Sequence, residues 1–310
     1  MPERVRRSPS RALAEAFFAV AIWGGTFVAT KRALVEASPA LVVWIRSGLG
    51  ALVLAAVAAG RGELARVGGR DLARLAFLGF LGIAFHQWLQ AQALQTSKAS
   101  TAAWLVTVSP IFTALLGRYL LREKLGARGV LGIALAAFGV LWVVAHGDFR
   151  SLFSSGFGTV GDLLMIASAL NWSIYTVFSR RILAAQPAGR ATFFVLSFGS
   201  LFSFLWLLAG PGIGGLGRIG LGGWSALLFL GILGSALAPL AWNDALETIP
   251  AARLSVLLYL EPPITTALAV ALKQEAWSWA TLWGGALIVI GVAMVNRLRG
   301  RPRGEPAAES

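Results

Sequence analysis

The chain contains an internal repeat. Residues 93–143 align without a gap on residues 245–295 at a fixed offset of 152, and 16 of the 51 aligned pairs are identical. Composition alone would give roughly five identities over such a stretch. The identical positions include Ala93/Ala245, Leu94/Leu246, Pro110/Pro262, Thr113/Thr265, Glu123/Glu275, Gly132/Gly284 and Gly139/Gly291. We therefore expect the fold to be built from two related halves.

Composition places both halves in a membrane. The chain is 57% hydrophobic and only 13% charged, whereas a soluble domain carries about 25% charged residues. Twelve Trp and 36 Gly agree with this, because Trp gathers at membrane interfaces and Gly lets helices approach closely. The predicted fold class is an all-α integral membrane protein.

Ten apolar segments are long enough to cross a bilayer, which requires about 20 helical residues. They lie near residues 12–30, 39–59, 72–96, 101–121, 127–146, 158–180, 191–210, 223–246, 253–272 and 277–296. The longest connection, at about 147–157, divides them into two sets of five. We predict a first five-helix repeat over residues 1–147, a second over 158–300 and a cytoplasmic tail over 301–310.

The distribution of positive charge predicts the orientation. If the N-terminus is cytoplasmic, 20 Lys and Arg residues fall in inside segments, six fall outside, and Arg46 lies within a span. This asymmetry follows the positive-inside rule and predicts cytoplasmic N- and C-termini in a bacterial inner membrane. The first apolar segment is followed by Lys31 and Arg32 and reads as a retained helix. Because five spans is an odd number, the second repeat is expected to be inverted.

Several classes of function fit poorly. The chain has no Cys and only two His, so we expect no disulfide, no metal site and no cofactor. The basic residues lie at span ends, which argues against nucleic acid as a partner. None of the four lysines follows Gly, so a phosphate-binding loop of an ATP-driven pump is absent. The acidic residues in apolar segments are isolated, which disfavours an integral-membrane enzyme such as a lipid-modifying transferase.

Inverted membrane repeats are instead the architecture of secondary transporters. Their substrate site lies between the repeats near the bilayer midplane, and the side open to it alternates. The partners predicted from sequence are a small-molecule substrate and the lipid bilayer. The sequence leaves the oligomeric state open, and a monomer of ten spans is compatible with it.

The motifs of the repeat resemble the EamA family of the drug/metabolite transporter superfamily. The similar stretches are residues 108–116, running to Leu121-Arg122-Glu123, and residues 259–263, running to Glu275, with the glycine-rich helices that follow them. Trp23-Gly24 and Asn171-Trp172 resemble the paired opening helices of the family's repeats. The resemblance implies a transporter of organic metabolites, and within the superfamily the chain is similar to aromatic amino acid exporters.

Aromatic and amide side chains near mid-span are the main candidates for a substrate site. Trp23 and Trp172 occupy matching places in the two halves, at a depth where interface anchoring does not explain a Trp. The candidates of this kind are Trp23, Asn171, Trp172, Tyr175, Trp242, Asn243 and Tyr259. A cavity lined by such residues suits an aromatic or amphipathic solute.

A polar run in the third span adds further candidates. His86, Gln87 and Gln90 lie within two helical turns, which is too polar for a face in contact with lipid. His86, Gln90 and Ala93 share one stripe at i, i+4 and i+7, and this stripe should face the bundle interior. A hydrogen bond between helices is the alternative explanation for His86.

Two charges and two prolines also fall inside predicted spans. Glu261 is interpreted either as an acceptor of local hydrogen bonds or as a site for a proton or a substrate amine. Arg46 could bind a substrate carboxylate, although a structural pairing is favoured. Pro110 and Pro262 each remove a helical hydrogen bond and are predicted to kink or interrupt their helices, as a fixed bend or as a hinge.

The predicted function is therefore export of a small organic metabolite by alternating access, most simply an aromatic or large neutral amino acid. The alternative cargo is a nucleotide sugar or a sugar phosphate carried on the same fold. That cargo would require several basic residues in the cavity, and Arg46 is the only basic residue in the middle of a span. The seven-residue spacing of Gly132 and Gly139, repeated as Gly284 and Gly291, predicts close helix packing.

Overall fold

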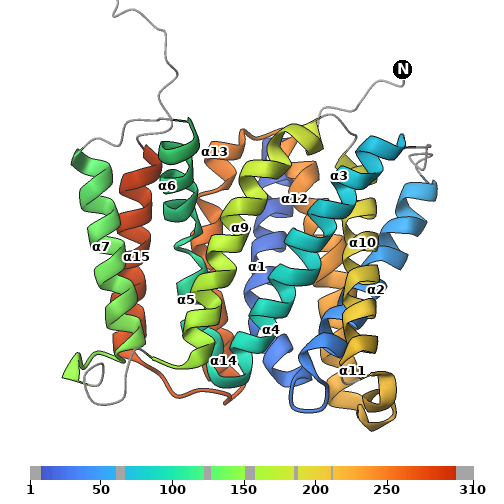
Figure 1. Cartoon of the computed structure of the whole chain (residues 1–310). Helices are drawn as coiled ribbons and strands as arrows, with labels where there is room; N and C mark the ends of the chain where they lie inside the picture. Colours follow the sequence, from blue (N-terminus) through green and yellow to red (C-terminus); the bar gives the residue numbers. More distant parts are fainter. Residues whose placement is uncertain are drawn as a thin grey trace, which may run out of the picture.

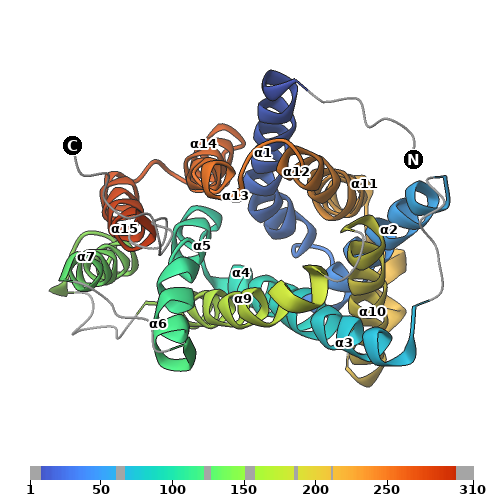
Figure 2. The same cartoon turned by 90° about the horizontal axis from the view of Figure 1, so that it is seen from above.

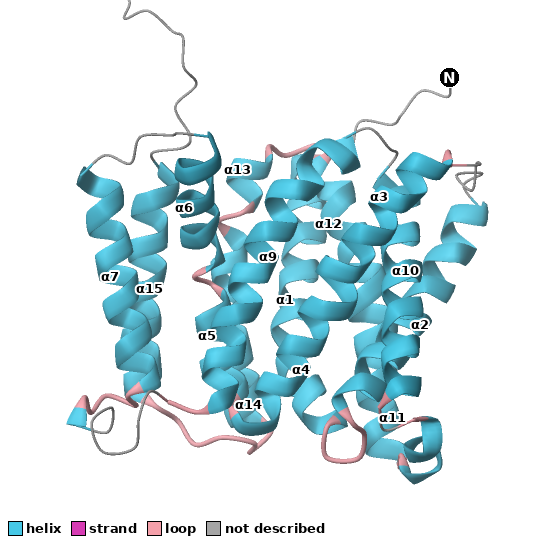
Figure 3. Ribbon diagram, viewed as in Figure 1, coloured by secondary structure: helices cyan, strands magenta, loops and turns pink. Residues whose placement is uncertain are grey.

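A computed structural model describes residues 8–60, 67–121, 127–150, 158–184, 188–210 and 212–297. Within these residues every regular element is a helix, and the helices stand roughly side by side (Figure 1 and Figure 3). Glu123, the tail at 301–310 and most of the connection predicted at 147–157 lie outside the described residues.

The prediction of an all-helical membrane protein is confirmed. Over the described residues, eight helices are long and apolar enough to cross a membrane. They correspond to the first eight predicted spans. The other two predicted spans, at 253–272 and 277–296, correspond to shorter apolar helices at Leu257–Ala271 and Trp279–Val295. The chain is therefore a multi-pass membrane protein, and the full count of ten spans stays a prediction.

The helices have the following bounds, with η1 and η3 being π-helical and η2 and η4 being 3₁₀ helices. They are α1 (Pro9–Ala33), α2 (Pro39–Gly60), α3 (Gly69–Gly79), η1 (Phe80–Phe85), α4 (His86–Thr96), α5 (Ala99–Val106), α6 (Ser109–Leu121), α7 (Ala127–Val144), α9 (Val160–Ala184), α10 (Ala188–Ala209), η2 (Ile213–Arg218), α11 (Leu221–Leu228), η3 (Phe229–Leu237), α12 (Ala238–Leu246), α13 (Ala251–Leu254), η4 (Leu257–Leu260), α14 (Glu261–Ala271) and α15 (Trp279–Arg297).

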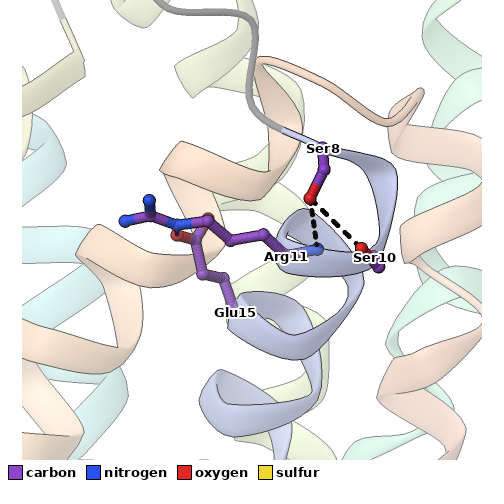
Figure 4. Close-up of polar contacts among 4 residues, drawn as sticks. All are labelled: Ser8, Ser10, Arg11 and Glu15. Atoms are coloured by element: carbon purple, nitrogen blue, oxygen red, sulfur yellow. Dashed lines mark hydrogen bonds and ion pairs between the residues drawn. The ribbon is translucent and has the colours of Figure 1, made fainter.

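The first helix begins with a local polar cap. Ser8 is the N-cap of α1, and its hydroxyl accepts a hydrogen bond from the Arg11 backbone N–H at 3.3 Å (Figure 4). Pro9 fits the first turn, where its missing N–H would have no intrahelical partner. One turn later Arg11 pairs with Glu15 at 3.0 Å. These contacts define where α1 begins. The start of α1 lies at the same end of the bundle as the end of α15 (Figure 1).

Viewed along the helix axes, the helices form an elongated ring (Figure 2). Helices α1, α12 and α14 form one long side, and α3, α4 and α9 form the other. Helices α2 and α10 pack together at one end of the ring, while α7 and α15 pack together at the other. Elements far apart in sequence are thus neighbours, as in the contacts of α1 with α12 and of α4 with α9.

Two long helices each contain a π-helical segment. Helix α3 continues through η1 into α4, and α11 continues through η3 into α12. A π-helical turn pairs each N–H with the carbonyl five residues earlier, so it shifts the ladder and leaves a carbonyl available to other donors. Both segments are followed by an α-helix whose first residues, His86 and Ala238, are 152 positions apart.

The helices that contain the repeated prolines are interrupted just before them. Helix α5 stops at Val106, a turn covers residues 107 and 108, and α6 begins at Ser109. In the second half a 3₁₀ segment ends at Leu260 and α14 begins at Glu261, again 152 positions later. Pro110 and Pro262 are therefore second residues of new helices, where a missing N–H is tolerated. Their role as hinges stays a prediction.

The repeated glycines bring α7 and α15 into backbone contact. A Cβ on Gly132 would lie 2.6 Å from the Gly291 carbonyl oxygen, and one on Gly139 would lie 2.6 Å from that of Gly284. The contact is reciprocal, since a Cβ on Gly291 would lie 2.4 Å from the Gly132 carbonyl oxygen. Only glycine permits this approach, which is the packing that the seven-residue spacing predicts.

The lower end of the bundle in Figure 1 carries a network of polar contacts between segments remote in sequence. Glu275, after α14, accepts a hydrogen bond from the Ala99 backbone N–H at 2.5 Å and a second from the Ser100 hydroxyl. It thereby satisfies donors at the N-terminus of α5, where a negative charge is also favoured by the helix dipole. The Lys31 ammonium donates to the Ser97 carbonyl oxygen at 2.5 Å, so α1 joins the same network.

Candidate functional site

Trp23 projects from α1 toward the second half of the chain. Its indole Nε1 donates a hydrogen bond to the Gly234 carbonyl oxygen at 3.3 Å. Gly234 lies within η3, where the π-helical ladder leaves carbonyls available. The Trp23 ring also packs against Trp242 of α12, with ring centroids 5.5 Å apart. Two of the predicted aromatic residues are thus in contact with one another.

Arg46 of α2 is buried beside this pair, with only 6% of its surface exposed. Its Nη1 donates to the Gln87 side-chain oxygen at 2.8 Å, and its Nε donates to the Ser235 hydroxyl at 3.4 Å. Both partners are neutral. Gln87, a predicted site residue, is therefore a hydrogen-bond acceptor for the guanidinium. Ser235 follows Gly234, whose carbonyl oxygen accepts the hydrogen bond from Trp23.

His86 lies on the other long side of the ring, at the start of α4. Its Nδ1 is 3.0 Å from the Ser168 hydroxyl of α9, and its ring packs on Trp172 with centroids 4.7 Å apart. Trp172 in turn stacks on Tyr175 at 4.9 Å. His86 is 5% exposed while Trp172 is 39% exposed. The interhelical hydrogen bond weighed for His86 from the sequence is present.

Asn171 and Tyr175 secure α9 against the first π-helical segment. The Asn171 side-chain nitrogen donates to the Leu81 carbonyl oxygen at 2.8 Å, and Leu81 lies within η1. Tyr175 packs so closely on Gly82 that a Cβ there would be 2.5 Å from its ring. Each π-helical segment therefore accepts a hydrogen bond from the opening helix of the other half, from Trp23 at η3 and from Asn171 at η1.

Gln90 and Tyr259 are the remaining predicted candidates, on α4 and η4. Gln90 is half-buried one turn after His86 on α4, and Ala93 on the same stripe is fully buried. Tyr259 belongs to η4 and packs against the buried cluster that includes Trp104, Ile111 and Ile288. Tyr259 thus takes part in the packing around α15.

Glu261 is the first residue of α14 and is half-buried beside α1. Its carbonyl oxygen accepts a hydrogen bond from the Thr265 hydroxyl at 3.0 Å, and that hydroxyl also donates to the Gly24 carbonyl oxygen at 2.7 Å. Among the described residues the Glu261 carboxylate has no hydrogen-bond or ion-pair partner. An ionised acid inside a membrane-spanning segment is costly and is normally paired, so a carboxylate without a partner points to a functional role.

The candidate residues therefore form two groups. The first, on α1, α2, α4, η3 and α12, comprises Trp23, Arg46, Gln87, Ser235 and Trp242, with Glu261 nearby on α14. The second, on α4 and α9, comprises His86, Ser168, Asn171, Trp172 and Tyr175. Sequence reasoning missed Ser168 and Ser235, because a serine in an apolar helix usually bonds its own backbone and carries no signal of a role.

These features define the class of protein as a multi-pass helical membrane protein with buried polar and aromatic residues in its interior. The EamA-like transporter family matches the chain twice, over residues 11–145 and again over residues 159–297. The chain belongs to this family, as the resemblance in its motifs predicted.

Individual relatives agree with this membership. An uncharacterized transporter of Archaeoglobus fulgidus is 28% identical over 275 residues, which cover 89% of this chain and 93% of the relative. A probable terminal-alkyne amino-acid exporter of Streptantibioticus cattleyicolor is 26% identical over 247 residues, covering 80% of each chain. A protein of known crystal structure is similar with a TM-score of 0.63 and 26% identity, covering 94% of this chain and 98% of that one.

Proposed function

We propose that the protein exports aromatic or large neutral amino acids by alternating access through a central cavity between two inverted five-helix repeats. The observation that carries the proposal is the double match to a transporter family, one match over each half of the chain. The relative named as a probable amino-acid exporter favours amino acids as the cargo class. The pairs Trp23–Trp242 and Trp172–Tyr175 supply aromatic surface for a large side chain.

The inverted layout is supported by matched interruptions and by one pair of helices. Helices begin at Gly69 and Leu221, at Ala99 and Ala251, and at Ser109 and Glu261, each pair 152 positions apart. Helices α7 and α15, which close the two halves, run antiparallel (Figure 1) and contact each other through equivalent glycines. A two-fold axis in the membrane plane would generate both features.

The orientation belongs to the same proposal. The positive-inside asymmetry of the sequence favours a cytoplasmic location for both termini, and a bacterial inner membrane as the location of the protein. With that orientation the polar network of Glu275, Ser100 and Lys31 would lie on the outer side.

A nucleotide sugar or a sugar phosphate remains the competing cargo. Among the described residues Arg46 is the only arginine or lysine whose side chain is buried. Its hydrogen bonds go to Gln87 and Ser235. One guanidinium fits a single carboxylate better than the several charges of a phosphate ester.

Uptake into proteoliposomes tests the cargo directly. The panel is labelled phenylalanine, tyrosine, tryptophan, leucine, glutamate and a nucleotide sugar, with and without an imposed pH gradient. Saturable uptake of the aromatic and large neutral members is the expected result. Uptake of the nucleotide sugar alone, or saturable uptake of none of the amino acids, would contradict the proposal.

A further inference from the structure

The interior of the bundle holds two opposite charges that are not paired with each other. Arg46 is 6% exposed and bonds only neutral partners, Gln87 and Ser235. Glu261 has no partner for its carboxylate among the described residues. The ion pairs Arg11–Glu15, Arg32–Glu36 and Arg74–Asp71 each join residues three or four positions apart, at the ends of the bundle.

Such an arrangement is unusual because a buried charge is normally matched by a counter-charge. Arg46 also has unused capacity. A guanidinium carries five N–H donors, and the protein engages two of its nitrogens. A carboxylate could accept two parallel hydrogen bonds from the remaining donors. An ammonium ion would in turn neutralise Glu261.

The backbone of Glu261 packs against α1 at Gly24, and the guanidinium of Arg46 lies near Gly234, which accepts a hydrogen bond from the adjacent Trp23. A Cβ on Gly24 would lie 3.0 Å from the Glu261 carbonyl oxygen. The neighbouring Trp23 donates to the Gly234 carbonyl oxygen, and a Cβ on Gly234 would lie 3.8 Å from Arg46 Nη2. Trp23 therefore stands between the element that carries Glu261 and the element that contacts Arg46.

We propose that Arg46 and Glu261 are the two poles of a receptor for a zwitterion. The substrate's α-carboxylate binds Arg46, its α-ammonium binds Glu261, and its apolar side chain lies against Trp23 and Trp242. Gln87 and Ser235 hold the guanidinium in position. This inference rests on the proposed amino-acid transport and deepens it, because it requires both charged groups on one substrate and assigns each of them a residue.

Competition in proteoliposomes tests the assignment. Uptake of labelled phenylalanine is measured against unlabelled phenylalanine, phenethylamine, which lacks the carboxylate, and 3-phenylpropionate, which lacks the ammonium. For the wild-type protein we expect both analogues to compete about 10- to 100-fold less well than phenylalanine, since each loses one charge-assisted contact. An analogue that competes as well as phenylalanine would overturn the proposal.

Two variants separate the poles. In Glu261→Gln the affinity for phenylalanine should fall about 10- to 100-fold toward that of 3-phenylpropionate, whose own affinity should not change. In Arg46→Gln the affinity for phenylalanine should fall toward the affinity for phenethylamine, which should itself not change. Glu15→Gln removes a carboxylate from the surface of α1 and is the matched control, with all three affinities preserved.

The outcomes distinguish this inference from the transport function. A wild-type protein that carries none of the amino acids would overturn both. If phenylalanine is transported but both variants lower the affinity for all three compounds equally, the two-pole receptor alone would be overturned. If gel filtration shows that Arg46→Gln does not fold, Arg46→Lys replaces it. Arg46→Lys keeps the charge without the guanidinium fork, so we expect a partial loss of affinity for phenylalanine.

Discussion

At the scale of single residues, the polar side chains of the interior bond across helices. His86 bonds Ser168, Asn171 bonds the Leu81 carbonyl, and Trp23 bonds the Gly234 carbonyl. In a membrane such bonds join helices that hydrophobic contact alone would not select, since lipid is as apolar as the helix surfaces. The same residues are candidates for the substrate site, so variants must separate stability from transport.

His86→Ala is predicted to destabilise the protein. The change removes the contact with Ser168 and the ring packing on Trp172, for a combined loss of about 1–3 kcal/mol. The thermal unfolding temperature of the purified protein in detergent measures this loss. Ser168→Ala should act on the same interaction, so the double variant should lose less than the sum of the two. Unchanged stability with reduced transport would instead place His86 in the transport pathway.

Glu36, in the connection after α1, is predicted to make stability depend on pH. The hydrogen bond from the Gly220 backbone N–H and the pairing with Arg32 lower the pKa of its carboxyl. A lowered pKa means that the contribution to stability is present above the ordinary pKa of a glutamate and is lost as pH falls through the lower value in the folded protein. Unfolding temperatures measured from pH 7 to pH 3 should fall more steeply for wild type than for Glu36→Gln.

The sequence predicted some residue positions and missed their partners. The stripe of His86, Gln90 and Ala93 was expected to face the interior, and His86 and Ala93 are buried. A structural pairing was favoured for Arg46, and its partners are Gln87 and Ser235. Those partners lie 41 and 189 positions away, and a single sequence contains no information on such contacts.

At the scale of elements, the repeat predicts more than the apolar pattern does. The two helix starts at Ala99 and Ala251 illustrate this, because they occupy equivalent positions of the repeat. Glu275 caps the first of them. The prolines at 110 and 262 indicated where helices break, and α6 and α14 begin one residue before them. The π-helical segments η1 and η3 were not foreseen. Their sequences are as apolar as the α-helices around them, and tertiary contacts rather than local preference select the wider turn.

Gly291→Ala is predicted to separate α7 from α15. A Cβ at this position would lie 2.4 Å from the Gly132 carbonyl oxygen and 2.7 Å from the Ala136 backbone nitrogen. Because both are backbone atoms, the helices must move apart, at a loss of about 1–3 kcal/mol. Gly69→Ala is the control, since a Cβ there has no atom within 4 Å. Equal unfolding temperatures for the two variants would show that the close approach contributes nothing to stability.

At the scale of the whole molecule, the first eight predicted spans were found and the last two are shorter helices. The ninth predicted span is divided by the 3₁₀ segment before Glu261, so the apolar helix there is shorter than the predicted span. The overall hydrophobicity of the chain is enough to predict that it is a membrane protein. The order of helices around the ring in Figure 2 depends on side-chain contacts that hydrophobicity does not encode.

The proposed sidedness predicts which surface positions are accessible from outside the cell. The chain has no Cys, so single cysteines can be introduced without background. In spheroplasts a membrane-impermeant maleimide should label Val35→Cys, in the connection after α1, and should not label Ser10→Cys at the start of α1. Both should be labelled after the membrane is permeabilised. The reverse pattern in spheroplasts would place the N-terminus outside.

The contact between α7 and α15 bears on how the two halves can move. Backbones that meet at two points seven residues apart leave little room for sliding or separation. These helices come last in the two halves of the chain and lie together at one end of the ring (Figure 2). The proposed alternating access would therefore have to expose the interior while α7 and α15 keep this contact, so relative movement of the two halves should be small at this end of the ring.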